Sequence, residues 1–467
     1  MTKVTGGTPR GRAEVRTAPS SAEAPTTPSA VPGPADVVVV GAGAVGLCCA
    51  LYLQRAGFRV AIVDRASPGA GASGSNAGIL SLGNVIPTAT PGILASVPHM
   101  LVDPLSPLAI RWTYLPRVAP WLVRFALASR RARAEACSRA LASLVVHASE
   151  AYEPFAPEGP FGFRSTGGVL CGYQTDRAFA RETYANELRQ RGGIRFRLVD
   201  QAAIAELDSG LAGRFRHGTL IEGRLTDDPR RFCEALAERF LTSGGELCQA
   251  EVTDLEVSAR GVETLLTTAG PLAANAFVLA AGVWSGRLAR KLGVAVPLDT
   301  ERGYGVDLPE PNVTFRLPIL SGEHHFALVP HADGSMRLAG TDELAGLGAP
   351  PNYARADRLI AAARTVFPEL RTTGARRWIG FRPSMPDALP VIGPVPRVPN
   401  AYLAFGHGHL GLSLAGITGR LVGELVEGRA PSVDLTPFSP TRFSLLPWRR
   451  GPSRRAASSE VADQMKG

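Results

Sequence analysis

The stretch that decides the fold is residues 36–64, DVVVVGAGAVGLCCALYLQRAGFRVAIVD. Its four consecutive valines are too apolar and too β-branched for a half-exposed strand, so they predict a buried strand of a parallel sheet. The next turn carries Gly41, Gly43 and Gly46 in the spacing G-x-G-x-x-G. This spacing allows a tight turn and lets backbone N–H groups approach a pyrophosphate closely.

The residues after the turn complete the pattern. A helix over 44–56, ended by Gly57, would direct its positive N-terminal end at the phosphates. A second apolar strand over 58–63 then brings Asp64 to the distance at which an acid accepts hydrogen bonds from a ribose. With 51 glycines in the chain, the spacing alone would be weak evidence, but strand, helix, strand and acid in order make it specific. A carboxylate would repel a 2′-phosphate, so NADP is not expected here.

Two further strand ends carry glycine. The apolar strand over 276–282 ends in Ala281-Gly282, and the last strand, over 401–405, ends in GHGHLG before a helix over 413–427. The loop 65–80 (RASPGAGASGSNAGIL) has small side chains and exposed backbone N–H groups that suit an extended cofactor. Three such ends are more than a nicotinamide cofactor needs, and they predict a longer ligand with adenosine, pyrophosphate and flavin ring on different strands.

The rest of the chain predicts a mixed α/β protein. Alternating residues over 295–345, with a turn at Asp333-Gly334, are typical of antiparallel strands. Helices are expected over 104–117, 121–133, 135–155, 175–191 and 354–366.

Composition limits the classes of function. The net charge of +9 could suggest nucleic acid or an anionic membrane, but much of it lies in the ends of the chain. We expect residues 1–35 and 446–467 to be disordered. We expect the protein to be cytoplasmic, with peripheral contact to the inner face of the cell membrane as an alternative. None of the six cysteines forms a C-x-x-C, so buried thiols and no metal site are expected.

Five motifs carry a resemblance over residues 36–445: DVVVVGAGAVGL, GASGSNAG, LAAGVWS, GFRPSMPDALPVIGP and GHGHLGLSLAGITGRLV. In order and spacing they resemble the FAD-dependent D-amino acid dehydrogenases of the D-amino acid oxidase, glycine oxidase and sarcosine oxidase superfamily. EHHFALVP and GHGHLGLSLAG look closer to the branch of hydroxyproline and D-proline dehydrogenases.

The resemblance implies a Rossmann-like, discontinuous FAD-binding domain and an α+β substrate domain built on an antiparallel sheet. The expected boundaries are 36–88, 224–295 and 387–445 for the FAD-binding domain, and 89–223 and 296–386 for the substrate domain.

It also implies the site. Arg382, in G-F-R-P, would bind the substrate carboxylate through a bidentate guanidinium, with Tyr304 and His325 helping to bind and orient the substrate. His407 would be structural or electrostatic, and neither it nor His409 is expected to be a general base. The expected FAD contacts are Gly41, Ala42, Gly43, Ala44, Val45, Gly46, Asp64, Arg65, Ser73, Asn76, Ala77, Gly78, Val252, Ala281, Gly282, Gly406, His407, Gly408, Leu410 and Gly411.

The implied reaction is hydride transfer from Cα of a D-amino acid to flavin N5, with non-covalent FAD and electrons passed to a quinone or another respiratory acceptor. The alternatives are a glycine or sarcosine type of oxidase that forms hydrogen peroxide, and a non-catalytic FAD-bound subunit of a heteromeric dehydrogenase. Nucleic-acid binding is the least favoured alternative.

Overall fold

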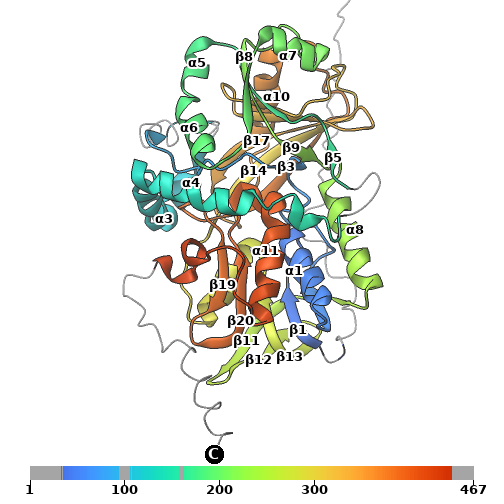
Figure 1. Ribbon diagram of the computed structural model, residues 1–467, viewed down its shortest axis with the longest axis vertical. Helices are drawn as coiled ribbons and strands as arrows, with labels where there is room; N and C mark the ends of the chain where they lie inside the picture. The colour runs from blue at the N-terminus through green and yellow to red at the C-terminus, as the bar shows by residue number, and fades with distance from the viewer. Residues whose placement is uncertain are drawn as a thin grey trace, which may run out of the picture.

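The computed structural model describes residues 35–93, 108–156 and 162–443, together with Gly33, Val102 and Ser106. Two large sheets lie one above the other along the long axis of the molecule, with helices around them (Figure 1). The predictions for residues 1–35 and 446–467 fall almost wholly outside the described residues. Within the described part of the chain, every helix is too short or too polar to cross a membrane.

The lower sheet of Figure 1 has a parallel centre. Its strands are β1 (Ala35–Val40), β2 (Val60–Asp64), β10 (Glu246–Gln249), β11 (Val252–Ser258), β12 (Gly261–Thr267), β13 (Gly270–Leu279), β19 (Val391–Val395) and β20 (Val398–Phe405). The order β10-β2-β1-β13-β20 is parallel throughout, as the valine run predicts. The first half of β13 pairs with the β11–β12 hairpin, and β19 is antiparallel to β20.

Helices cover this sheet. They are α1 (Ala44–Arg55), α8 (Pro229–Thr242), α9 (Ser285–Lys291) and α11 (Gly411–Val426). α1 and α11 cross so closely that a Cβ at Gly419 would lie 2.6 Å from the backbone of Cys48. Small residues at this crossing therefore set the distance between the helices. All six cysteines are buried, as the sequence predicts.

The upper sheet is mostly antiparallel, with the order β18-β14-β17-β16-β15-β6-β8-β7. Its strands are β4 (Leu108–Ile110), β6 (Val169–Tyr173), β7 (Phe196–Asp200), β8 (His217–Ile221), β14 (Asp299–Leu308), β15 (Ile319–Ser321), β16 (Phe326–Pro330), β17 (Met336–Leu344) and β18 (Arg376–Ser384). The two sheets together confirm the predicted fold class.

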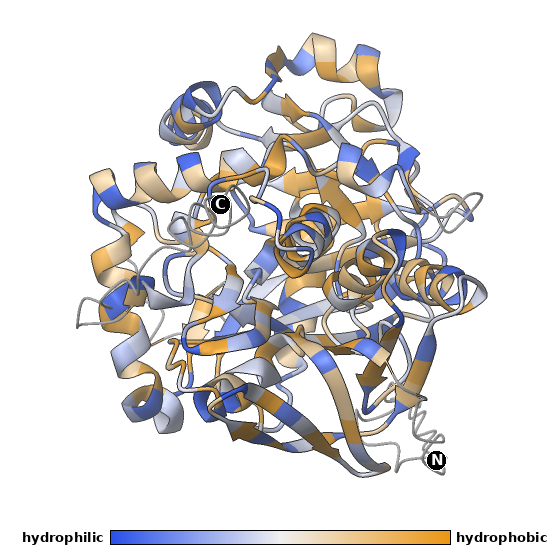
Figure 2. Cartoon of the chain, turned by 60° about the horizontal axis from the view of Figure 1, so that its bottom comes forward, coloured by the Kyte–Doolittle hydropathy of each residue, from blue (hydrophilic) through white to orange (hydrophobic). Residues whose placement is uncertain are grey.

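One face of the upper sheet is covered by α10 (Ala354–Val366), which lies where the sequence predicts a helix. The helix expected over 175–191 is divided into α5 (Asp176–Ala180) and α6 (Thr183–Arg191). A short helix, α7 (Gln201–Leu207), begins after Asp200, whose carboxylate accepts a hydrogen bond from the N–H of Ala203 as an N-cap. In Figure 2 the outer helices carry hydrophilic and hydrophobic bands, as amphipathic helices on a sheet should.

The helix expected over 104–117 is wrong for residues 108–114, and only residues 115–117 are helical, at the start of a longer helix. Residues 108–110 form β4, which pairs in parallel with β17, and a single 3₁₀ turn follows at Trp112–Tyr114. A short apolar run fits a strand or a helix equally well, and here the edge of β17 supplies hydrogen bonds that the sequence does not reveal. Two helices follow, α3 (Leu115–Ala128) and α4 (Arg131–Val145).

A third sheet is small and is made of short strands. It consists of β3 (Ile79–Ser81), β9 (Gly223–Leu225) and β5 (Arg164–Ser165), in the order β3-β9-β5. The N–H of Ser81 donates to Ser413 Oγ at 2.9 Å, which ties this sheet to the start of α11. The loop that precedes β3 is thereby held over the parallel edge of the lower sheet.

Candidate active site

The turn between β1 and α1, the first of three glycine turns, is closed by glycines at positions where no side chain fits. Gly41 has φ +115°, and a Cβ there would lie 2.5 Å from the carbonyl oxygen of Ala280. A Cβ at Gly46 would lie 1.9 Å from the carbonyl oxygen of Gly41. The turn therefore brings α1 against β1 with bare backbone at its surface, which is the geometry that pyrophosphate binding requires.

Asp64 ends β2 beside this turn. Its Oδ2 accepts a hydrogen bond from the N–H of Ala42 at 2.7 Å, and its Oδ1 accepts one from Ala66 at 2.9 Å. Burial raises the pKa of Asp64, and these backbone N–H groups and the Arg65 charge oppose that shift. Each carboxylate oxygen can accept more than one hydrogen bond, so Asp64 keeps the capacity to accept a further one, and its contact with a ribose stays a prediction.

The loop after Asp64 folds back over the first turn. Ser73 Oγ accepts a hydrogen bond from the N–H of Ala44 at 3.0 Å, at the N-terminus of α1. Asn76 Oδ1 accepts one from Gly78 at 2.7 Å and shapes the end of the loop. The guanidinium carbon of Arg65 lies 3.8 Å from the centre of the Trp284 ring. The loop residues expected to contact FAD are thus drawn together around the parallel edge.

The three glycine-bearing strand ends meet at one edge. β13 lies between β1 and β20, and all three are parallel, so their carboxyl ends are neighbours. Gly282, with φ +56°, begins a 3₁₀ turn over Gly282–Trp284. Gly406 has φ +83°, and a Cβ there would lie 2.8 Å from Met385 Cγ. The end of β10 reaches the same edge, since Ala250 donates its N–H to the carbonyl oxygen of Asp64 at 2.8 Å, two residues before Val252.

The third turn leads into α11 through a 3₁₀ turn at Gly408–Leu410. His407 is buried there, and its Nε2 lies 2.9 Å from Thr418 Oγ1. Burial lowers the pKa of His407 to about 3, so the ring is neutral in ordinary buffers. His407 is therefore a hydrogen-bonding group that fixes the turn on α11, which agrees with a structural role.

Arg382 lies on β18, in the upper sheet, with a largely buried side chain. Its Nη1 contacts Asp342 Oδ1 and donates to the carbonyl oxygen of Thr341 at 3.1 Å. A Cβ at Gly303, on the neighbouring strand β14, would lie 2.4 Å from the guanidinium. The guanidinium is therefore held flat on a strand with no side chain beneath it.

Two contacts place Arg382 next to the edge of the lower sheet where the three glycine turns meet, which we call the cofactor edge. Two residues before it, Gly380 is so close to the loop that a Cβ would lie 2.7 Å from the carbonyl oxygen of Ser75. Two residues after it, Ser384 forms a β-bridge with His407 of the third turn. Because Arg382 lies between these contacts, its strand spans from the loop over the first turn to the turn before α11.

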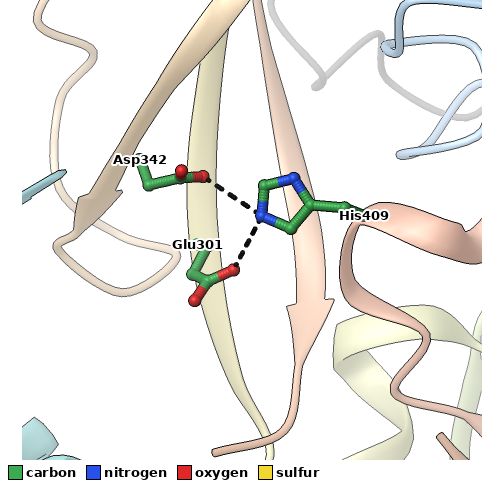
Figure 3. Close-up of side chains that lie close together, drawn as sticks. All are labelled: Glu301, Asp342 and His409. Carbon is green, nitrogen blue, oxygen red and sulfur yellow. Dashed lines mark ion pairs between the residues drawn. The ribbon is translucent and has the colours of Figure 1, made fainter. Parts of the chain in front are cut away.

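A polar group that the sequence did not predict adjoins Arg382 through Asp342, and Figure 3 shows three of its members, Glu301, Asp342 and His409. His409 Nε2 lies 3.3 Å from Glu301 Oε2 and 3.6 Å from Asp342 Oδ1. Ser384 Oγ donates to Glu301 Oε2 at 2.7 Å. Burial alone would raise the pKa of Glu301, but hydrogen bonds from His409 and Ser384 and the Arg382 charge lower it, so this buried carboxylate stays ionised.

Tyr304 does not point at Arg382. Its side chain is fully buried in the core beneath α10, on the opposite face of β14 from Glu301. Its hydroxyl donates to Glu343 Oε2 at 2.6 Å and accepts from the N–H of Asn352 at 3.0 Å. The expectation that Tyr304 binds the substrate carboxylate therefore needs correction: the strand alternates, and the hydroxyl is already used in the core.

His325 lies at the turn before β16, with φ +54°. It is exposed by surface area, yet desolvation lowers its pKa; the charge of His324 acts in the same direction and that of Asp342 opposes the shift. It therefore belongs to the outer part of the polar group, without a hydrogen bond to Arg382 among the described residues.

Three side chains of this group also have the spacing of a metal site. The ligand atoms of Glu301, Asp342 and His409 lie within 4.8 Å of one another. The same Asp342 oxygen already contacts the Arg382 guanidinium, and a divalent cation there would face a positive charge. We therefore assign no metal to this group.

The family comparison bears on the cofactor. Residues 36–425 match the family model described as FAD dependent oxidoreductase. The chain belongs to this family. The oxidoreductase is thus an enzyme with FAD as its cofactor, and the glycine turns, Asp64 and the loop fit that ligand.

Similar proteins cover nearly the whole oxidoreductase. It is 39% identical over 417 residues to a D-amino-acid oxidase of Bradyrhizobium diazoefficiens, covering 87% of this chain and 98% of the relative. It is 31% identical over 423 residues to a D-amino acid dehydrogenase of Paramagnetospirillum magneticum, covering 88% and 100%. The solved glycine oxidase of Geobacillus kaustophilus superimposes with a TM-score of 0.66 at 25% identity, covering 87% of this chain and 98% of that one.

Proposed function

We propose that this protein oxidises D-amino acids and that Arg382 binds the substrate carboxylate. The observation that carries the proposal is the position of Arg382, between the Ser75 and His407 contacts with the cofactor edge. A guanidinium there offers a carboxylate two parallel, charge-assisted hydrogen bonds. The names of the relatives, D-amino-acid oxidase and D-amino acid dehydrogenase, support the same substrate class.

Different residues of the chain bind the substrate and the cofactor. When bound, FAD would supply the acceptor for the hydride of the substrate Cα, and the imino acid product would be hydrolysed by water to a 2-oxo acid and ammonia after its release. Arg382 orients the substrate by its carboxylate, while the glycine turns and Asp64 hold the non-covalent cofactor at the parallel edge. The backbone N–H groups that begin α11 face this edge and stabilise negative charge that develops there.

Cyclic D-amino acids, D-proline and cis-4-hydroxy-D-proline, are the specific substrates that we propose to test first. The motif EHHFALVP suggested them, but two of its residues have structural contacts. Glu323 accepts a hydrogen bond from the N–H of Gln174 at 2.6 Å, and His324 Nε2 lies 2.9 Å from Gln174 Oε1. His325 is the member of this motif that remains to distinguish substrates.

For the electron acceptor we propose a respiratory quinone reached at the membrane surface. The support is an exposed apolar surface on and beside α3, where the side chains of Trp112 and Val123 are each 61% exposed and Leu127 is 47% exposed. Arg130 and Arg131 adjoin Leu127 in a shallow groove. Apolar side chains with arginines beside them suit the interface of an anionic bilayer.

The second candidate is an oxidase that passes electrons to oxygen. The 39% identical relative named D-amino-acid oxidase favours it. Hydrogen peroxide formed in stoichiometric amount during turnover would select the oxidase, and rapid turnover with a quinone but not with oxygen would select the dehydrogenase.

The experiment that tests the substrate class is anaerobic bleaching of the bound flavin. D-amino acids, including D-proline and cis-4-hydroxy-D-proline, should bleach the yellow absorbance, and their L-enantiomers should leave it unchanged. Glycine and sarcosine complete the panel. Bleaching by the isolated chain excludes the non-catalytic subunit, whereas a yellow protein that no amino acid bleaches contradicts the proposal.

A further inference from the structure

Strand β17 carries an irregularity beside Arg382. Arg302 of β14 pairs with Glu343 and Tyr304 pairs with Gly340, so two residues of β17 oppose Gly303 alone. The first of the two, Thr341, has φ +58°, which is rare for a β-branched residue. Such bulges re-aim side chains, and backbone strain of this kind is concentrated at functional sites.

The bulge directs Asp342 at the guanidinium. Asp342 Oδ1 contacts Arg382 Nη1, and the carbonyl oxygen of Thr341 lies 3.1 Å from the same nitrogen. If the register set by the Tyr304–Gly340 pair continued without the bulge, Asp342 would pair with Arg302 and turn to the other face of the sheet. The chain itself therefore occupies the place where a substrate carboxylate would bind.

We propose that Asp342 stands in for the substrate carboxylate in the free enzyme, is displaced from Arg382 when substrate binds, and then pairs with the substrate ammonium. In this role it selects zwitterionic amino acids over carboxylic acids that lack the amino group. The inference rests on the proposed function and adds a specificity-determining residue to it.

The charges around Asp342 support this role. Two carboxylates, Asp342 and the ionised Glu301, face the single guanidinium of Arg382. The other titratable neighbours are His409, whose Nε2 is 3.6 Å from Asp342 Oδ1, and His325, whose pKa is lowered by desolvation and by His324 while Asp342 opposes that shift. A ligand that has a carboxylate but no amino group would pair with Arg382. Asp342 would then lie beside Glu301 without enough positive charge to balance the two carboxylates.

An amino acid avoids this cost because it brings its own cation. The carboxylate and the ammonium are attached to the same carbon, so a carboxylate on Arg382 delivers the ammonium next to the group that it displaces. The pairing of Asp342 simply changes from guanidinium to ammonium. An isolated displaced carboxylate would instead be stranded in a half-buried site.

The test uses two ligands of one shape that lack a Cα–H bond and cannot be oxidised: 2-aminoisobutyrate and 2-hydroxyisobutyrate. Dissociation constants for the FAD-loaded enzyme, from calorimetry or perturbation of the flavin spectrum, should favour the amino acid. In Asp342→Asn this preference should fall by about tenfold or more, because the ammonium loses a charged acceptor while Arg382 is no longer neutralised. The hydroxy acid should bind more tightly to the variant than to the wild type.

Controls separate the possible failures. Asp357→Asn, on α10, removes a carboxylate that pairs at 2.6 Å with Arg377, which lies on the same strand as Arg382. This variant should leave the preference unchanged. Asp342→Ser, with FAD content and Tm checked, should repeat the loss if Asp342→Asn is poorly folded. An unchanged preference in both Asp342 variants, with D-amino acids still oxidised, overturns this inference and leaves the proposed function standing.

The same selectivity is measured independently with D-alanine as substrate and D-lactate as competitive inhibitor. In Asp342→Asn, kcat/KM for D-alanine should fall while the inhibition constant of D-lactate also falls. Failure of the wild type to bind or oxidise any amino acid would instead reject the proposed function.

Discussion

The cofactor edge and the Arg382 end of the site are built in different ways. The edge consists of backbone: Gly41, Gly282 and Gly406 end three parallel strands that are neighbours in the sheet. The Arg382 end consists of side chains that come from three strands and the turn before α11. The backbone site is fixed by local sequence spacing, whereas the side-chain site depends on how distant strands align.

This difference predicts how each region responds to change. The edge should tolerate no added atoms, but its function does not depend on one side-chain charge. The Arg382 end should keep its fold when a single group is removed, yet lose recognition of its ligand.

Gly46→Ala should have the largest effect. The new Cβ would lie 1.9 Å from the carbonyl oxygen of Gly41, so α1 must move away from β1. We expect a loss of unfolding free energy of about 3 kcal/mol or more, at the upper end of overpacking costs, together with loss of bound FAD. Gly348→Ala, outside the loop that folds over the glycine turn, is the control, because a Cβ there meets nothing within 4 Å. Flavin absorbance after gel filtration and chemical unfolding measure both effects.

Arg382→Ala should leave FAD in place but lower kcat/KM for D-amino acids by about a hundredfold or more, the scale for truncating one partner of a buried charged pair. Arg377→Ala, on the same strand but paired with Asp357 at the surface, should change kcat/KM little. Steady-state kinetics and flavin content decide the outcome. Equal loss in both variants would mean that the strand, and not the guanidinium, is what matters.

His407 should make the edge sensitive to acid. Burial lowers its pKa from 6.5 to about 3, so the unfolded chain takes up a proton first as the pH falls through 6.5. Stability therefore declines from pH 7 downward, and this residue alone should account for about 2 kcal/mol at pH 5.

The measurement is urea unfolding at pH 7 and pH 5. His407→Gln should lower stability at pH 7 but flatten its pH dependence. His147 is partly exposed, and His147→Gln should leave the pH dependence of stability as it is in the wild type. An unchanged slope in His407→Gln would show that the ring is not buried in neutral form.

The smallest effect concerns the cysteines. Burial raises the pKa of Cys171 and Cys233 to about 12 and that of Cys137 to about 11. Because the thiolate is the reactive form, the native protein should react slowly with a disulfide reagent, and the six thiols should react quickly after unfolding. Rapid reaction of a thiol in the native protein would indicate that the core around that cysteine opens.

The sequence predicted the edge well because its signals are local. Valine runs, glycine spacing and Asp64 all lie within one strand-turn-helix-strand unit, and each later strand end repeats the signal. The assignment of Arg382 depended on the resemblance to a family. The contacts of its strand with Ser75 of the loop and with His407 of the turn before α11 show where this residue lies. Buried cysteines followed from their apolar surroundings.

The parts that failed depend on partners distant in the chain. Residues 108–110 form a strand because β17 offers an edge, and Tyr304 faces the core because of the alternation along β14. That period of two could have grouped Glu301 with Gly303 on the other face. No sequence signal announces the bulge at Thr341, so the approach of Asp342 to Arg382 is visible only in the structure.

The most direct test of the account is a crystal structure of the FAD-loaded protein with 2-aminoisobutyrate. The account predicts the pyrophosphate at the Gly41 turn, the flavin ring between the Gly406 turn and Arg382, and the ligand carboxylate on the Arg382 guanidinium. FAD bound away from the glycine turns, or a ligand carboxylate held by other residues while Arg382 keeps only Asp342, would contradict it.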